Sequence, residues 1–119
     1  MGVAIKRVYD VASNADGLRI LVDRLWPRGV SKQAAQIDQW LRDLAPSARL
    51  RRWFDHDPEK WVEFKERYFI ELDKRRSLVD TIRNEANRGT VTLLFAARDT
   101  EFNNASVLRE YVTRSENAA

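Results

Sequence analysis

Two apolar runs, each followed at once by charged residues, constrain the fold of this chain most strongly. Val91–Ala97 carries no charge, and Ile20–Val22 is a shorter run of the same kind. Runs without alternating polar residues are typical of strands buried on both faces, as in parallel sheets. The sequence therefore predicts an α/β fold with Thr90–Ala97 at the centre of the sheet.

The rest of the chain supplies another strand and several amphipathic helices. Val3–Tyr9 is predicted to be the first strand and Leu18–Asp23 the second. The connection between them is too short for a helical crossover, so they form either an antiparallel pair or parallel strands joined by an extended return. N-capping residues and helical spacing of apolar residues predict helices in Ile37–Leu44, Ser47–Phe54, Asp57–Leu72, Leu78–Ala86 and Asn103–Val112.

We expect one domain over residues 1–119, with a mainly parallel sheet of about three strands flanked by five or six helices. The composition, 44% apolar and 33% charged, favours a globular chain over a disordered one. Cysteine is absent, which excludes disulfides and cysteine nucleophiles. No apolar run approaches the roughly 18 residues that span a bilayer, and the first residues lack a signal-peptide core. A cytoplasmic protein without a membrane partner is expected.

The end of the second strand carries the first candidate site. Ligands of α/β proteins bind outside the carboxyl ends of the strands. Here the strand runs into Asp23, a possible proton acceptor, and into the cations Arg24 and Arg28. Trp26 lies between them and offers a flat face for stacking. Because arginine donates paired hydrogen bonds to phosphate or carboxylate, this segment predicts an anionic ligand.

The third strand ends in the same way, with Ala96–Ala97 followed by Arg98 and Asp99. If the two strands are parallel neighbours, both ends lie in one crevice. Asp23 and Asp99 then divide the roles of acid and base between them. The alternative is that these are structural Asp–Arg pairs that tie loops to the sheet.

His56 is the only histidine and is flanked by Asp55 and Asp57. It is a candidate general acid or a cation for a phosphate, unless it is simply a surface residue beside a helix cap. No second histidine or cysteine accompanies it, so no metal site is predicted. Glycine-rich phosphate loops are absent, so arginines and helix N-termini would hold a nucleotide. The basic segment Ala48–Trp53 is a candidate nucleic-acid surface.

The chain also resembles a known family. Leu21–Gly29 (Leu-Val-Asp-Arg-Leu-Trp-Pro-Arg-Gly), Leu44–Ser47, His56–Asp57 and Ala96–Asp99 are similar to segments of the YeaO-like family of uncharacterised bacterial proteins, in the group with domain of unknown function 488. The resemblance implies a small cytoplasmic α/β domain and carries no established reaction. It places the family's polar positions on Asp23, Arg24, Arg28, Lys32, Ser47, Arg51, His56, Arg98, Asp99 and Asn104.

These observations predict a protein that binds, and in one version also turns over, an anionic small molecule such as a nucleotide or phosphorylated metabolite. Asp23, Asp99 and His56 are the candidate catalytic residues. The candidate ligand-binding residues are Arg24, Trp26, Arg28, Lys32, Arg51, Arg98 and Asn104. The alternatives are a nucleic-acid-binding or processing protein and a non-catalytic partner-binding domain. The sequence leaves open whether there is a reaction, which cofactor is used and what the oligomeric state is.

Overall fold

Four parallel strands form the sheet in the order β1-β4-β2-β3 in this computed structural model, which describes residues 2–115. The strands are β1 (Gly2–Arg7), β2 (Leu18–Leu21), β3 (Gln39–Trp40) and β4 (Thr90–Phe95). The α/β class and the central position of β4 are as predicted. The first strand, whose direction the sequence left open, is parallel to β2 and is separated from it by β4.

Strand β4 is buried on both faces, and its residues alternate between two cores. Val91, Leu93 and Phe95 belong to the larger core, to which all four α-helices contribute. Leu94 belongs to a smaller core on the opposite face. The long connection between β2 and β3 covers that face, through side chains such as Trp26 and Ile37. The period-2 alternation of a strand thus distributes one apolar run over two environments.

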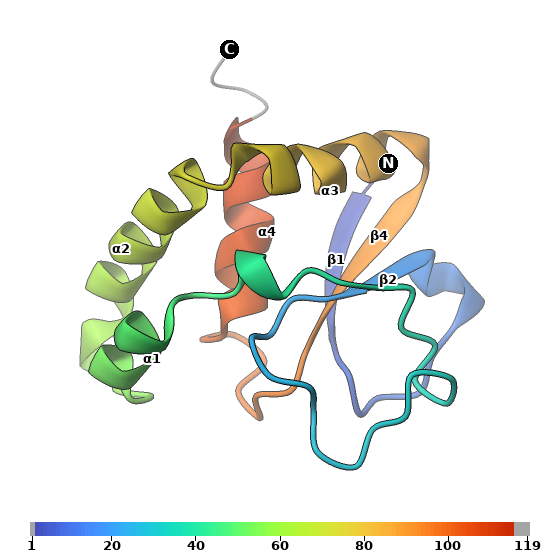
Figure 1. The fold of residues 1–119 in the computed structure, drawn as a ribbon, viewed down its shortest axis with the longest axis horizontal. Coiled ribbons are helices and arrows are strands. Elements are labelled where there is room, and N and C mark those ends of the chain that lie inside the picture. The colour runs from blue at the N-terminus through green and yellow to red at the C-terminus, as the bar shows by residue number, and fades with distance from the viewer. Residues whose placement is uncertain (1, 116–119) are drawn as a thin grey trace.

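Four α-helices pack on the larger core (Figure 1). Three of them begin close to predicted capping residues. Ser47 caps the first helix, and Asp57 and Pro58 begin a 3₁₀ turn that leads into the second. At the start of the last helix, the Asn103 side chain accepts a hydrogen bond from Ser106 N–H. Within residues 2–115, no helix is long and apolar enough to span a membrane. The helices are α1 (Ala48–Phe54), α2 (Trp61–Asp73), α3 (Arg76–Arg88) and α4 (Asn104–Ser115).

The helix predicted over Ile37–Leu44 is wrong, and the sheet therefore has one strand more than expected. Gln39 and Trp40 form β3 beside β2, and a 3₁₀ helix follows at Arg42–Leu44. Asp38 N–H donates to Arg19 O, and Leu41 N–H donates to Leu21 O. These ladder bonds to a strand edge outweigh a short helical periodicity, which has no capping side chain to support it.

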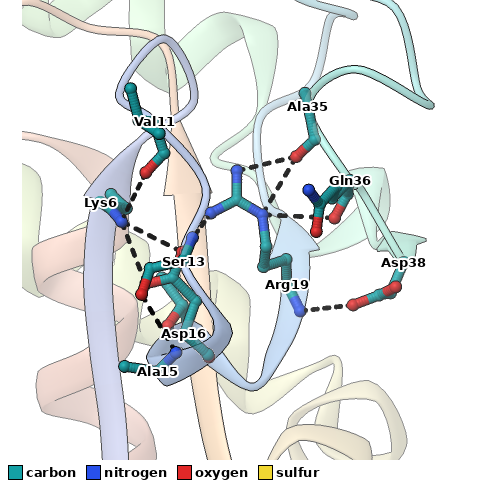
Figure 2. Close-up of polar contacts among 10 residues, drawn as sticks. Lys6, Val11, Ser13, Ala15, Asp16, Arg19, Ala35, Gln36 and Asp38 are labelled. Atoms are coloured by element: carbon teal, nitrogen blue, oxygen red, sulfur yellow. Dashed lines mark hydrogen bonds and ion pairs between the residues drawn. The ribbon is translucent and has the colours of Figure 1, made fainter.

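A polar clamp of Lys6, Asp16 and Arg19 fastens the β2–β3 connection to the sheet (Figure 2). The Arg19 side chain is almost fully buried, lies 2.6 Å from an Asp16 carboxylate oxygen and donates to the backbone oxygens of Ala35 and Gln36. Burial of Asp16 disfavours its charge, but hydrogen bonds from a backbone N–H, Lys6 and Arg19 outweigh this and lower its pKa. The clamp therefore holds the loop that covers the smaller core.

Candidate functional site

A pocket of about 360 Å³ opens at the carboxyl edge of the sheet. All four strands are parallel, so their carboxyl ends lie at this edge. Ligands of α/β folds generally bind at this edge of the sheet. The segments after β1, β2 and β4 line the pocket together with α1 and the start of α4. Its wall thus brings together residues that are distant in the sequence.

Asp23 joins three of these segments. One carboxylate oxygen accepts a hydrogen bond from Ala96 N–H at 2.9 Å, after β4, and the other accepts from Asn104 Nδ2 at 3.1 Å, at the start of α4. Asn104 Nδ2 also donates to Val22 O, and Trp40 Nε1 donates to Asp23 O. These contacts fix the Asp23 carboxyl between the ends of β2 and β4.

Burial raises the pKa of Asp23 above its usual value. The N–H of Ala96, the amide of Asn104 and the charge of Arg51 oppose this increase without cancelling it. A buried carboxylate that is held by neutral donors and a single nearby cation is destabilised in its ionised form. Asp23 is therefore both a structural link and the acid at this edge that holds its proton more strongly than usual.

Three arginines line the same pocket with free side chains. Arg24 and Arg28 come from the loop after β2, and Arg51 comes from α1. All three are exposed, and no other side chain or backbone group among residues 2–115 forms a hydrogen bond or salt bridge with their guanidinium groups. Guanidinium donors left unpaired around a concave surface are available to an anion.

Arg98 and Asp99 do not line this pocket but an adjacent hollow of about 430 Å³. The Asp99 carboxylate accepts hydrogen bonds from the N–H groups of Phe102 and Glu101, each at 2.9 Å. These two bonds lower its pKa, burial slightly opposes them, and the charge of His56 adds to the decrease. Asp99 thus shapes the turn before α4.

His56 lies between the two hollows and lines both. It is exposed, and its ring centroid is 6.3 Å from that of Phe54. Asp55 and His56 have φ values of 48° and 55°, a left-handed conformation that non-glycine residues seldom adopt. This reversal after α1 places the imidazole at the rim of the pocket.

The other predicted binding residues differ in their positions. Trp26 lines the pocket, but its Nε1 donates to Val30 O at 2.7 Å and its ring packs edge-on against Trp40. Asn104 also lines the pocket, where it holds Asp23. Lys32 is exposed and is not part of the pocket wall. A role in ligand binding remains a prediction for all three.

Sequence reasoning missed several apolar and aromatic residues of the wall. Tyr9 follows β1 at the same edge and donates its hydroxyl hydrogen to Arg28 O at 3.0 Å. Its position at the end of the predicted strand Val3–Tyr9 was a usable signal. Phe54 follows Arg51 by three residues on α1 and shares its face. Phe102 lies in the turn after β4, where no periodicity marks it.

Comparison with known proteins gives a family but no activity. The sequence model described as "Inactive DUF488-N3 subclade" matches residues 2–118. Uncharacterized protein YeaO of Escherichia coli (strain K12) is 38% identical over 112 residues, which cover 94% of this chain and 97% of YeaO. Uncharacterized protein Rv3073c of Mycobacterium tuberculosis (strain ATCC 25618 / H37Rv) is 39% identical over 108 residues, 91% of each chain. No solved structure matches the chain.

Proposed function

For this chain, which belongs to the inactive DUF488-N3 subclade and is a YeaO-like protein, we propose from the geometry of the pocket that it binds a nucleotide or another phosphorylated small molecule. The proposed site is the pocket at the carboxyl edge of the sheet. Arg24, Arg28 and Arg51 hold the phosphate, and the aromatic wall accommodates the remainder of the ligand.

The observation that carries this proposal is the set of three unpaired arginines around one concave surface. A volume of about 360 Å³ falls within the range of small-molecule sites, which are mostly apolar with a few convergent polar groups. The wall has this character, because Ala45, Pro46 and Phe54 alternate with the charged side chains. Phosphate suits the site because its oxygens can accept donors from several guanidinium groups at once.

Binding without turnover is the simplest form of the proposal. Both oxygens of Asp23 already accept hydrogen bonds from the protein, and Asp99 is occupied with two backbone N–H groups in a turn. The family description uses the word inactive. A role for Asp23, Asp99 or His56 in proton transfer stays a prediction, and product analysis after incubation with each bound nucleotide tests it.

Isothermal titration with nucleoside mono- and diphosphates, sugar phosphates and inorganic phosphate tests the binding site. Arg51→Ala should weaken binding about tenfold or more, because a hydrogen bond to a charged group contributes about 1.5–3 kcal/mol. Arg49→Ala is the matched control, since Arg49 is an exposed residue of the same helix that is not part of the pocket wall. Equal affinities of the wild type and Arg51→Ala for every phosphate tested would contradict the proposal.

A further inference from the structure

The central pocket has a hollow on each side that shares part of its wall. The first, here called the Lys74 hollow, measures about 320 Å³ and shares Arg24 and Ala45 with the pocket. The second, here called the Arg98 hollow, measures about 430 Å³ and shares five residues with it, among them His56 and Phe102. A ligand that fills the pocket therefore has room to extend in two directions.

Helix α1 sets the order of the three hollows. Its N-cap Ser47 lines the Lys74 hollow, Arg51 near its middle lines the central pocket, and His56 just beyond its end lines the Arg98 hollow. Seven residues of α-helix extend about 10 Å. The three hollows thus form a track beside α1 rather than a cluster around one point.

Unpaired cations occur along the whole track. Lys74 and Arg75 line one end, Arg24 lies where the Lys74 hollow meets the pocket, and Arg98 lines the other end. None of these four side chains forms a hydrogen bond or salt bridge with another part of residues 2–115. The basic residues that do form salt bridges lie outside the three hollows, and they are Lys6, Arg19, Lys65, Arg67, Arg83 and Arg88.

Most carboxylates in the walls of the track accept hydrogen bonds from other groups of the protein. Glu71 accepts hydrogen bonds from the N–H and the hydroxyl of Ser47, and Asp99 and Asp23 accept from N–H groups as described. Asp43 is the remaining acidic residue in the walls of the three hollows. The six Lys and Arg residues therefore exceed the four acidic residues, and the track is positive before His56 is counted.

Exposed aromatic rings accompany these charges. Tyr9 is 48% exposed at the central pocket, and Phe102 is 40% exposed where the pocket meets the Arg98 hollow. One side of each ring is in contact with the protein, since the Arg7 guanidinium lies over Tyr9 and Phe102 packs edge-on against Trp61, and the rest of each ring is open to a ligand. A positive surface with partly exposed aromatic rings is the arrangement by which proteins bind single-stranded nucleic acids, since bases can stack while the cations follow the phosphates. Inorganic phosphate would be bound by the cations alone, whereas the aromatic rings favour a ligand that also carries bases.

We infer that the ligand is a short single-stranded nucleic acid, of which the nucleotide in the central pocket is one unit. This inference rests on the proposed function and names its ligand class. Nucleotides of a stacked strand rise about 3.4 Å each, so a strand that runs along the roughly 10 Å of α1 contains about three of them. Lys74 and Arg75 contact the phosphate at one end of the strand, and Arg98 contacts the phosphate at the other.

A length series tests the inference. In isothermal titration calorimetry, 5′-phosphorylated oligo-dT and oligo-U of one to six nucleotides are titrated into the protein. Affinity should rise from one to about three nucleotides and then level off. The slope of log affinity against log salt should steepen from about −0.7 for one phosphate to about −2 for three. The DNA and RNA series together show which sugar the track prefers.

Variants at the ends of the track separate the inference from the proposed function. Arg75→Ala and Arg98→Ala should each weaken binding of the trinucleotide about five- to tenfold and leave binding of the mononucleotide unchanged. Arg76→Ala is the matched control, because Arg76 is exposed beside Arg75 and lines none of the three hollows. Equal affinity for one and three nucleotides would overturn the inference and leave the proposed function standing. If the wild type binds neither the mononucleotide nor the trinucleotide, both the inference and the proposed function are overturned.

Discussion

The substitution Asp23→Asn tests the conclusion that Asp23 is a structural link. The carboxylate accepts from two donors, Ala96 N–H and Asn104 Nδ2, through different oxygens. An amide of the same shape has one oxygen, so its NH₂ group must face one of these donors. An unsatisfied buried donor costs about 1–3 kcal/mol. The relief of a destabilised charge offsets part of this cost, since burial raises the pKa of Asp23. A net loss of about 1–2 kcal/mol at neutral pH is expected.

Urea denaturation followed by tryptophan fluorescence measures this loss. For a chain of 119 residues the unfolding entropy of about 2.1 cal/mol/K per residue converts 1 kcal/mol into about 4 °C of melting temperature. The Asp23→Asn variant should therefore melt about 4–8 °C lower than the wild type. Asp43→Asn is the control, because Asp43 is exposed, and its effect should stay within about 0.5 kcal/mol.

The pH dependence of the same difference identifies its cause. The folded-state pKa of Asp23 lies above its ordinary value of 3.8, so the native state binds this proton more tightly than the unfolded state. The contribution of Asp23 to stability is therefore present below pH 3.8 and is lost as the pH rises through the folded-state pKa. The advantage of the wild type over Asp23→Asn should grow as the pH falls from 7 toward 4. An advantage that does not change with pH, or an Asn variant as stable as the wild type, would refute this reasoning.

Three further predictions concern the scaffold and the separation of core from site. Arg19→Met should cost about 3–5 kcal/mol in urea denaturation, because it breaks a buried ion pair and leaves backbone oxygens without donors; a loss below 1 kcal/mol would contradict the clamp. Gly17→Ala should lower the melting temperature far more than Gly89→Ala, since the first adds a Cβ 2.1 Å from a backbone oxygen at a φ of 64° and the second meets nothing within 4 Å. Phe64→Ala should cost about 3–5 kcal/mol and Arg28→Ala less than about 0.5; similar losses would make Arg28 a structural residue.

The sequence was sufficient for the parts of the fold that depend on local patterns. The uncharged run of β4 predicted its central position, and Ser47 and Asp57 predicted helix starts because their side chains accept N–H groups of the first turn. Strand β3 was not predictable in this way. Its two residues are strand because β2 offers a free edge, and a ladder partner that lies nineteen residues away is invisible to periodicity.

The candidate site was predictable only in part for a similar reason. The expectation that parallel strand ends meet brought Asp23, Arg24 and Arg28 to one edge, and they line one pocket. Arg98 and Asp99 lie next to it, because the turn that Asp99 forms directs the chain toward α4. The contribution of α1 depends on how the helix packs on the sheet, which residue spacing alone does not determine.

The central claim is that the pocket at the carboxyl edge of the sheet binds phosphate-bearing ligands. The indole N–H signals of the four tryptophans in a ¹H–¹⁵N NMR titration with a nucleoside monophosphate test it directly. Trp26 lines the pocket, whereas Trp53 contacts Lys60 and Arg67 and lies outside its wall. We expect a saturable shift of the Trp26 signal, an unchanged Trp53 signal, and loss of the Trp26 shift in Arg51→Ala. A Trp26 signal that does not move at saturating ligand, or that moves equally in Arg51→Ala, would contradict the claim.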